Sequence, residues 1–165
     1  MARQYSTGNT LTCTSINSLG NSATAIACSA AYTPSTTANV TEVHVECTIS
    51  SPATFTASGS TVVNVYAAAS VDGTIWDSAN VTMELIDGTD KAITLDADGN
   101  NLRFLGSVLM PQTTAGTSVI HKKTFPIAAS MGFLPKKFVV LFQNQTGATL
   151  PASGHSFSVT EEYFN

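Results

Sequence analysis

Three side chains with metal-binding chemistry alternate along one segment of the sequence. Glu42, His44 and Glu46 occupy every second position, about 6.6 Å apart on one face if the segment is a strand. A metal site needs donor atoms within about 2 to 2.5 Å of one point, so neighbouring strands would have to supply more ligands. His121 and His155 are the candidates. Because polar alternation is also typical of a solvated strand face, the sequence favours that interpretation and predicts neither a metal nor another cofactor.

A second group of oxygen ligands resembles the start of a calcium-binding loop. Asp96, Asp98 and Asn100 match the first three ligand positions of that loop. The pattern also requires glycine at its sixth position and glutamate at its twelfth, where this chain has Asn101 and Ser107. Since the segment DADGN is typical of a tight hairpin connection, the sequence predicts a turn here.

Motifs for catalysis are missing from the sequence. It contains no GxSxG, no HExxH and no glycine-rich loop that opens a helix. Cys13, Cys28 and Cys47 are dispersed, as are the three histidines. Glu161 and Glu162 are adjacent, and adjacent residues of a strand point to opposite faces, so the two carboxylates cannot share a substrate. We therefore predict that the protein is not an enzyme.

Trp76, the only tryptophan, is the one candidate for a ligand contact. It follows a turn in the segment VDGTIWD, and an exposed aromatic ring in such a loop can stack on a sugar ring. The other interpretation is an apolar plug at the end of the domain. The sequence favours the plug and keeps the ligand contact as the alternative.

The overall charge argues against a nucleic-acid partner. The 165 residues include seven Lys and Arg against 11 Asp and Glu, for a net charge of −4 and a pI of about 5.1. Binding to phosphate backbones depends on clustered Lys and Arg, and the densest clusters here are two lysine pairs. The sequence contains no run of about 18 apolar residues, so it predicts no membrane-spanning helix. The first residues lack the apolar stretch of a secretory signal, so we expect synthesis in a cytosol. The three cysteines are an odd number without short-range pairing, so we expect no disulfide framework.

Composition and alternation predict an all-β fold. Charged residues make up only 11% of the chain, while 24 Thr and 18 Ser supply much of its polar character. Threonine is β-branched and suits a strand face that is partly exposed to solvent. Segments with a period of two, or short apolar runs, are separated by turn signals. The predicted strands cover residues 41–49, 61–70, 80–86, 91–95, 101–110, 118–127, 136–144 and 154–164, with weaker signals in 11–16 and 22–32.

The strand spacing predicts an antiparallel, jelly-roll-like β-sandwich in one domain. We expect residues 1–9 to form a flexible N-terminal arm and residues 10–165 to form the sandwich. Residues 101–110 are apolar in both phases, which predicts a central strand, whereas Pro126 predicts a sheet edge or bend. Cys47 shares the apolar phase and should be a buried free thiol. The other predicted core residues are Val43, Val45, Val63, Phe104, Val140, Phe142 and Phe157.

Four segments resemble a family of small virion proteins encoded by tailed bacteriophages and prophages. They are SINSLGNSATAIACSAAY, VYAAASVDGTIWDSANV, NLRFLGSVLMPQT and FPIAASMGFLPKKFVVLFQNQTGATLPASGHSFSVTEEYF, in order between residues 11 and 164. The sharpest part follows the pattern FxxxxxxGxLPKKxxVxxxNxTGxxLxxxGH. It is carried here by Phe125, Gly132, Leu134, Pro135, Lys136, Lys137, Val140, Asn144, Thr146, Gly147, Leu150, Gly154 and His155.

The resemblance implies a β-sandwich that decorates the capsid, as a cement protein, and it brings no catalytic residues. The implied partners are the major capsid protein and further copies of the chain, as a homotrimer around a local symmetry axis. The implied location is the virion, after assembly in the cytoplasm of the bacterial host. The alternative is a receptor- or glycan-binding module on a tail or fibre, which Trp76 alone supports in the sequence.

Overall fold

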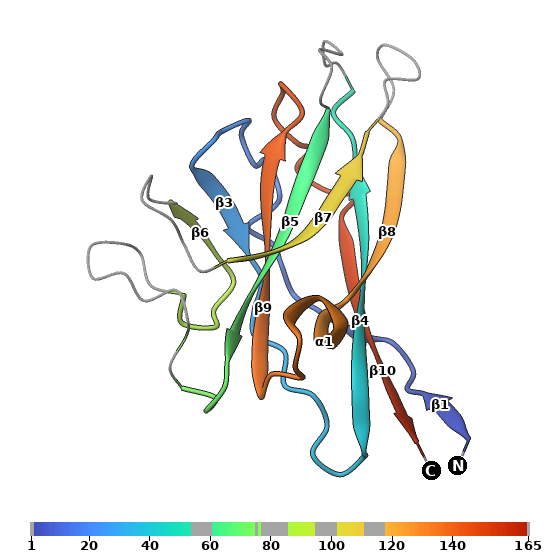
Figure 1. The fold of residues 1–165 in the computed structure, drawn as a ribbon. Coiled ribbons are helices and arrows are strands. Elements are labelled where there is room, and N and C mark those ends of the chain that lie inside the picture. Colours follow the sequence, from blue (N-terminus) through green and yellow to red (C-terminus); the bar gives the residue numbers. More distant parts are fainter. Residues whose placement is uncertain are drawn as a thin grey trace.

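Alternating apolar and polar residues build ten strands and one short helix in the part of the chain that the structure describes (Figure 1). The computed structural model describes residues 2–53, 61–74, 76, 86–94, 102–110 and 118–164. No helix within these residues is long and apolar enough to cross a membrane. The elements are β1 (Arg3–Tyr5), β2 (Asn9–Thr10), β3 (Ala25–Cys28), β4 (Val40–Ser50), β5 (Val62–Ser70), β6 (Lys91–Thr94), β7 (Arg103–Leu109), β8 (Ile120–Pro126), α1 (Ile127–Met131), β9 (Lys137–Gln145) and β10 (Ser156–Phe164).

The strands form two antiparallel sheets that pack face to face (Figure 1). The first, called the β4 sheet, has the order β1–β10–β4–β8, and β2 also pairs with β10. The second, called the β9 sheet, has the order β6–β3–β9–β5–β7. The arrangement confirms the predicted all-β sandwich, while its jelly-roll connectivity stays a prediction.

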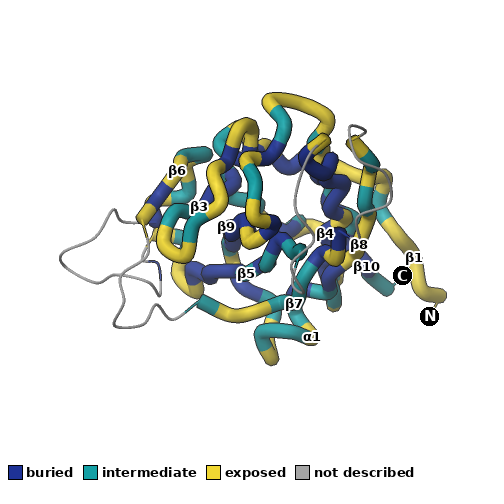
Figure 2. Tube along the Cα trace, turned by 90° about the horizontal axis from the view of Figure 1, so that it is seen from above, coloured by how far each residue is buried: buried dark blue, intermediate teal, exposed yellow. Residues whose placement is uncertain are grey.

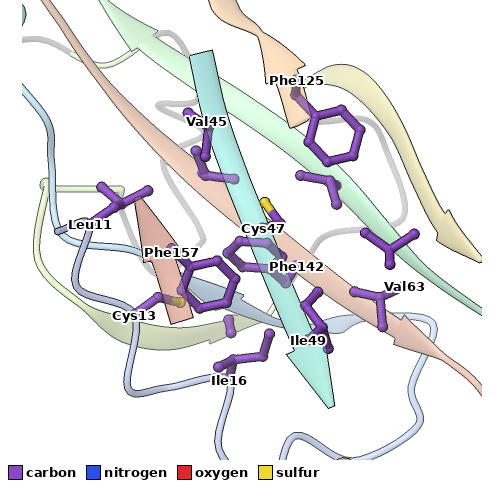
Figure 3. Close-up of a cluster of buried hydrophobic side chains, with 14 of the residues drawn as sticks. Leu11, Cys13, Ile16, Val45, Cys47, Ile49, Val63, Phe125, Phe142 and Phe157 are labelled. Atoms are coloured by element: carbon purple, nitrogen blue, oxygen red, sulfur yellow. The ribbon is translucent and has the colours of Figure 1, made fainter. Parts of the chain in front are cut away.

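The main core lies between the two sheets, where the inward phase of each strand is apolar (Figure 3). On β4 the residues between these apolar positions are more exposed, as the period of two predicts. Phe142 of β9 and Phe157 of β10 meet across the sheets with ring centroids 4.6 Å apart. The predicted core residues that the structure confirms as buried are Val43, Val45, Cys47, Val63, Val140, Phe142 and Phe157.

A second apolar cluster covers the outer face of the β9 sheet. Val139 and Leu141 point to this face, so β9 is buried on both sides, which accounts for its continuous apolar run. Trp76 packs into this cluster and is 8% exposed. Gly88 has a φ of 83°, and a Cβ at this position would lie 3.0 Å from the indole. Glycine therefore lets the backbone pass close to the tryptophan ring.

The prediction that Phe104 is buried is wrong, because its side chain is 53% exposed. The cause is a β-bulge between β5 and β7. Val65 pairs with Gly106, but the next residue of β5, Tyr66, pairs with Phe104, so Leu105 is an extra residue. The extra residue reverses the alternation: Leu105 packs on the core, and Phe104 faces outward against Tyr66.

The prediction of a central strand at residues 101–110 is also wrong, because β7 is an edge of the β9 sheet. β7 lies beside β8, the edge of the β4 sheet, where Nζ of Lys123 donates to the carbonyl oxygen of Ser107 at 2.9 Å. Pro126 ends β8 and leads into α1, as its position at a sheet edge or bend predicts. Phe104 and Leu109 of β7 are exposed, so apolar residues in both phases do not indicate burial on both faces of this strand.

The N-terminal residues join the β4 sheet, whereas the sequence predicts a flexible arm at residues 1–9. β1 and β2 both pair with β10, through backbone contacts that leave no apolar signal in the sequence. Residues 11–16, predicted as a strand, contain none, although Leu11 and Ile16 of this segment are buried in the core. Part of the segment 22–32 does form a strand, β3.

Two predicted features lie largely or wholly outside the described residues. The strand predicted over residues 80–86 is described only at Ile86, which is buried. The ligand positions of the calcium-like segment that lie outside are Asp96, Asp98, Asn100 and Asn101. Ser107, its last position, lies on β7, where its hydroxyl donates to Oδ1 of Asn64 at 2.7 Å.

Thiol labelling of the native protein is expected to leave Cys47 unmodified. Its side chain is fully buried, and burial raises the pKa of its thiol, so both access and the thiolate fraction are low. Mass spectrometry of labelled peptides should detect modification only once denaturant unfolds the sandwich. Cys28 is a matched control, because it is also fully buried and burial raises its pKa to about 12. Rapid labelling of Cys47 in native buffer would mean that the register of β4 is inverted.

Candidate functional site

The acidic residues considered as metal ligands have separate structural roles. Glu42 accepts hydrogen bonds from the backbone N–H of Ala128 at 2.6 Å and of Ala129 at 2.8 Å, so its carboxylate holds the start of α1. Glu46 is exposed and lies 4.0 Å from the ammonium group of Lys122. Among the described residues, no group of three or more His, Cys, Asp or Glu side chains is placed to hold a metal ion.

A charged cluster on the β4 sheet joins three of its strands. Nε of Arg3, on β1, lies 3.0 Å from Oε1 of Glu162 on β10. Nε2 of His44, on β4, lies 3.4 Å from the other oxygen of the same carboxylate. The ring of Tyr5 lies over this cluster, with its centroid 6.4 Å from that of His44. The cluster therefore holds β1 to the rest of the sheet.

Glu161 points to the opposite face from Glu162, as predicted for adjacent residues of a strand. Its Oε1 accepts a hydrogen bond from the hydroxyl of Tyr32 at 2.9 Å and another from the backbone N–H of Ser35 at 2.7 Å. These contacts fasten the segment after β3 to the end of β10. The two carboxylates hold different parts of the sandwich and do not converge on one site.

His155 ties the segment before β10 to the end of β4. The backbone N–H of Ser50 donates to Nδ1 at 3.2 Å, and Nε2 donates to the carbonyl oxygen of Pro151 at 3.0 Å. Burial lowers the pKa of His155, and the hydrogen bond to Pro151 offsets part of that effect. Both ring nitrogens are engaged in the neutral form, so His155 would lose a hydrogen bond by binding a metal.

We expect the protein to lose stability as the pH falls from about 7.5 to about 5.5. Burial lowers the pKa of His121 and of His155 below the value of 6.5 that applies to an exposed histidine. The unfolded chain therefore binds more protons in this range, and stability that is fully present above pH 6.5 declines as the pH falls. Urea denaturation at the two pH values measures this loss.

The control for this prediction is His155→Gln, which keeps a donor and an acceptor but does not titrate. The difference in unfolding free energy between the two pH values should be smaller in the variant than in the natural protein. Asp87 does not contribute, because hydrogen bonds from Thr89 and Lys91 lower its pKa to about 2. An identical pH dependence in the variant would contradict the role assigned to His155.

Trp76 is buried, so a ligand could reach its ring only if the packing around it changed. Its indole packs against the outer face of the β9 sheet, close to Gly88 and Ala31. This position agrees with a packing role, although the ring covers a sheet face and not the end of the sandwich. A ligand contact at Trp76 stays a prediction, and it would require the cluster to open.

An aromatic pair, of which Phe104 is exposed and Tyr66 half-buried, and a row of amides occupy another part of the β9 sheet. The rings of Tyr66 and Phe104 lie 5.3 Å apart on the outward side of β5 and β7. Oε1 of Gln143 accepts hydrogen bonds from the Tyr66 hydroxyl and from Nδ2 of Asn64, each at 3.2 Å. Nδ2 of Asn64 also donates to Gln145 at 3.2 Å. We call these five residues the aromatic–amide face, and all five side chains are uncharged.

Exposed apolar side chains occur at both ends of the sandwich. Val71 follows β5 and Phe133 precedes β9, and they line a depression of about 250 Å³ together with Pro34, Leu134 and Pro135. Leu109 ends β7 and Ile120 begins β8 at the opposite end (Figure 1). Each end of the sandwich therefore exposes two large apolar side chains.

A shallow groove of about 410 Å³ lies between residues 10–14 and the start of β10. Glu46 and His155 border it, but His155 uses both of its ring nitrogens elsewhere. The remaining polar lining is mostly hydroxyl groups, which suit water or a polar chain. These hydroxyl residues are Thr10, Thr12, Thr14, Ser156 and Ser158.

Two polar side chains have structural roles that the sequence motifs above do not indicate. Asn144 is fully buried and makes four hydrogen bonds around the turn after β9. The carboxylate of Asp90 accepts hydrogen bonds from Thr14 and Ser15. Burial alone would raise the pKa of Asp90, but these hydrogen bonds outweigh it and lower the pKa. The segments NQTG and DGTD, which contain these two residues, have the composition of turns capped by Asn or Asp.

Comparison of the chain with protein-family models, with curated proteins and with solved structures gives no match. The described polar and charged groups lie mainly in contacts that hold the sandwich together. Phe104 and Gln145 of the aromatic–amide face are exposed, as are the apolar side chains at the two ends, whereas Gln143 is buried.

Proposed function

We propose that the protein is a structural virion protein that decorates and stabilises the capsid of a tailed bacteriophage. The observation that carries the proposal is the contrast between its buried and exposed groups. Glu42, Glu161 and Glu162 hold elements of the sandwich together. The exposed surface includes apolar side chains at both ends and, from the uncharged aromatic–amide face, Phe104 and Gln145. Such a surface suits contact with other proteins better than it suits chemistry on a substrate.

The in-order resemblance of residues 11–164 to small virion proteins supports the same proposal. In that role the partners are the major capsid protein and other copies of the chain, as a homotrimer, without a cofactor or nucleic acid. A decoration protein is present in many copies, so each contact can be weak while the array is firmly attached. Broad polar contacts between each copy and the shell would then be sufficient for attachment.

The proposal is tested by locating the protein in intact particles of the phage or induced prophage that encodes it. Electron microscopy with a specific antibody should label the head, and removing the protein should lower the temperature at which the capsid ruptures. Label on the tail, or particles that lack the protein, would overturn the proposal.

A glycan-binding module on a tail or fibre is the second candidate, and the pair of exposed Phe104 and half-buried Tyr66 favours it. Aromatic rings next to amide groups are able to stack on a sugar ring and bind its hydroxyls. Glycan-array screening with Phe104→Ala and Trp76→Ala separates the two sites. Binding that Phe104→Ala abolishes would support this candidate, whereas a decoration protein should bind no glycan specifically.

A further inference from the structure

The N-terminal arm, residues 2–10, lies on the sheet without any apolar anchor. Its side chains are exposed apart from the half-buried Ser6, and the first buried residue is Leu11. Even Tyr5, its largest side chain, is 54% exposed. The arm therefore contributes almost nothing to the hydrophobic core, and detaching it uncovers little apolar surface.

Backbone pairing and a few polar contacts hold the arm to β10. Arg3 to Tyr5 pair with residues 162–164, and Asn9 and Thr10 pair with residues 158 and 159. Between these two ladders the backbone N–H of Ser6 donates to the carbonyl oxygen of Glu161 at 2.9 Å. The charged contact is the one between Arg3 and Glu162, at 3.0 Å. All of these are contacts that another strand of the same sequence could make.

Without the arm, β10 would be an unpaired edge strand. Its free N–H and C=O groups could form a backbone ladder with any extended segment. The carboxylate of Glu162, whose side chain is 11% exposed, would in addition favour a strand that brings a cation to the position of Arg3. A second copy of the chain supplies both the strand and the cation in the correct register.

The arm is also placed where a neighbour could receive it. β1 lies at the periphery, beside both termini, and extends away from the body of the sandwich (Figure 2). We propose that the arm exchanges between copies, so that residues 2–10 of one copy pair with β10 of the next. Exchange of identical elements costs little because each contact is remade in the partner.

This inference deepens the proposed function, since it names the contact between copies, and it rests on that proposal for its setting. In dilute solution each chain pairs with its own arm, because the tether gives that arm a high effective concentration. Crowded copies on a shell make exchange competitive. The exchange itself is a property of the purified chain, so its test needs no virion and its failure would leave the capsid location open.

Two charge-reversed variants provide the test. In Arg3→Glu alone and in Glu162→Arg alone, residues 3 and 162 carry like charges. They repel each other whether the arm pairs within its own chain or with another copy of the same variant. In a 1:1 mixture, reciprocal exchange between the two variants restores both opposite-charge contacts. Analytical ultracentrifugation should show monomers for each variant alone and a mixed dimer in the mixture, with a dimer fraction that falls as salt is added.

The double variant Arg3→Glu with Glu162→Arg is the matched control, because it restores the contact within one chain. It should melt above each single variant, although it still lacks the contact between His44 and the Glu162 carboxylate. A mixture that stays monomeric at every concentration, while the double variant recovers stability, would show that the arm pairs only within its own chain and would overturn the inference.

Cysteine cross-linking gives a second readout that does not depend on charge. Gln4 lies opposite Tyr163 in the ladder, at a separation within the range of a disulfide. A mixture of Gln4→Cys and Tyr163→Cys should form a mixed covalent dimer whose yield rises with protein concentration. Gln4→Cys mixed with Thr36→Cys, an exposed site off the arm, measures random collision. Equal yields in the two mixtures would contradict exchange.

Discussion

Replacing Phe142 by alanine is expected to lower the free energy of unfolding by about 3 to 5 kcal/mol. Phe142 is fully buried between the sheets, and its ring meets Phe157 with centroids 4.6 Å apart. Truncation removes this packing from both sheets and leaves a cavity that the surrounding strands fill only in part. A domain of this size has about 5 to 15 kcal/mol of stability, so the variant should unfold at a much lower urea concentration.

Phe104→Ala is the matched control, since it makes the same chemical change on β7, another strand of the same sheet. Phe104 is 53% exposed and contacts Tyr66 outside the core, so its loss should cost about 1 kcal/mol or less. Equal destabilisation by the two changes would contradict the bulge that turns Phe104 outward. Urea titrations followed by circular dichroism measure both variants under identical conditions.

The second large effect is expected at Asn144. Its Nδ2 donates to the carbonyl oxygens of Leu19 at 2.8 Å and Ala148 at 2.7 Å. Its Oδ1 accepts from the backbone N–H of Thr146 at 3.0 Å and from the hydroxyl of the same residue at 2.7 Å. Each buried group that loses its partner costs about 1 to 3 kcal/mol, so Asn144→Ala should destabilise the protein by about 3 kcal/mol or more.

The neighbouring change Gln145→Ala serves as its control. Gln145 is exposed, and its amide bonds only to other side chains of the aromatic–amide face. Solvent can replace those contacts, so the expected loss is below about 1 kcal/mol. Hydrogen exchange should also show faster opening of the segment around Leu19 in Asn144→Ala alone. Similar effects of the two changes would mean that the amide of Asn144 is not the group that holds the turn.

Strand alternation was sufficient to predict the class of fold and most of the core. On β4 the buried Val43, Val45 and Cys47 follow the period of two without interruption. On β9 the predicted core residues Val140 and Phe142 are both buried between the sheets. These predictions succeed because side-chain direction in a strand is a local property of the backbone.

The candidate surfaces could be predicted only in part, because they depend on partners that are distant in the chain. Trp76 is recognisable as a packing or stacking residue, but its position over the β9 sheet depends on Gly88 and Ala31. The Tyr66–Phe104 pair depends on the register between β5 and β7. No single segment of the sequence contains that information.

Alternation along the sequence identifies most of the strands and their apolar phase, but it misses β1 and β2. The register between strands and the segments that cover the strand edges depend on the tertiary structure. The outward turn of Phe104 follows from the pairing of β7 with β5, in which Val65 pairs with Gly106 and Tyr66 with Phe104. The arm of exposed residues becomes a strand because β10 offers it backbone partners. Both outcomes are set by long-range hydrogen bonds, which are specified by neighbouring strands and not by the local pattern of side chains.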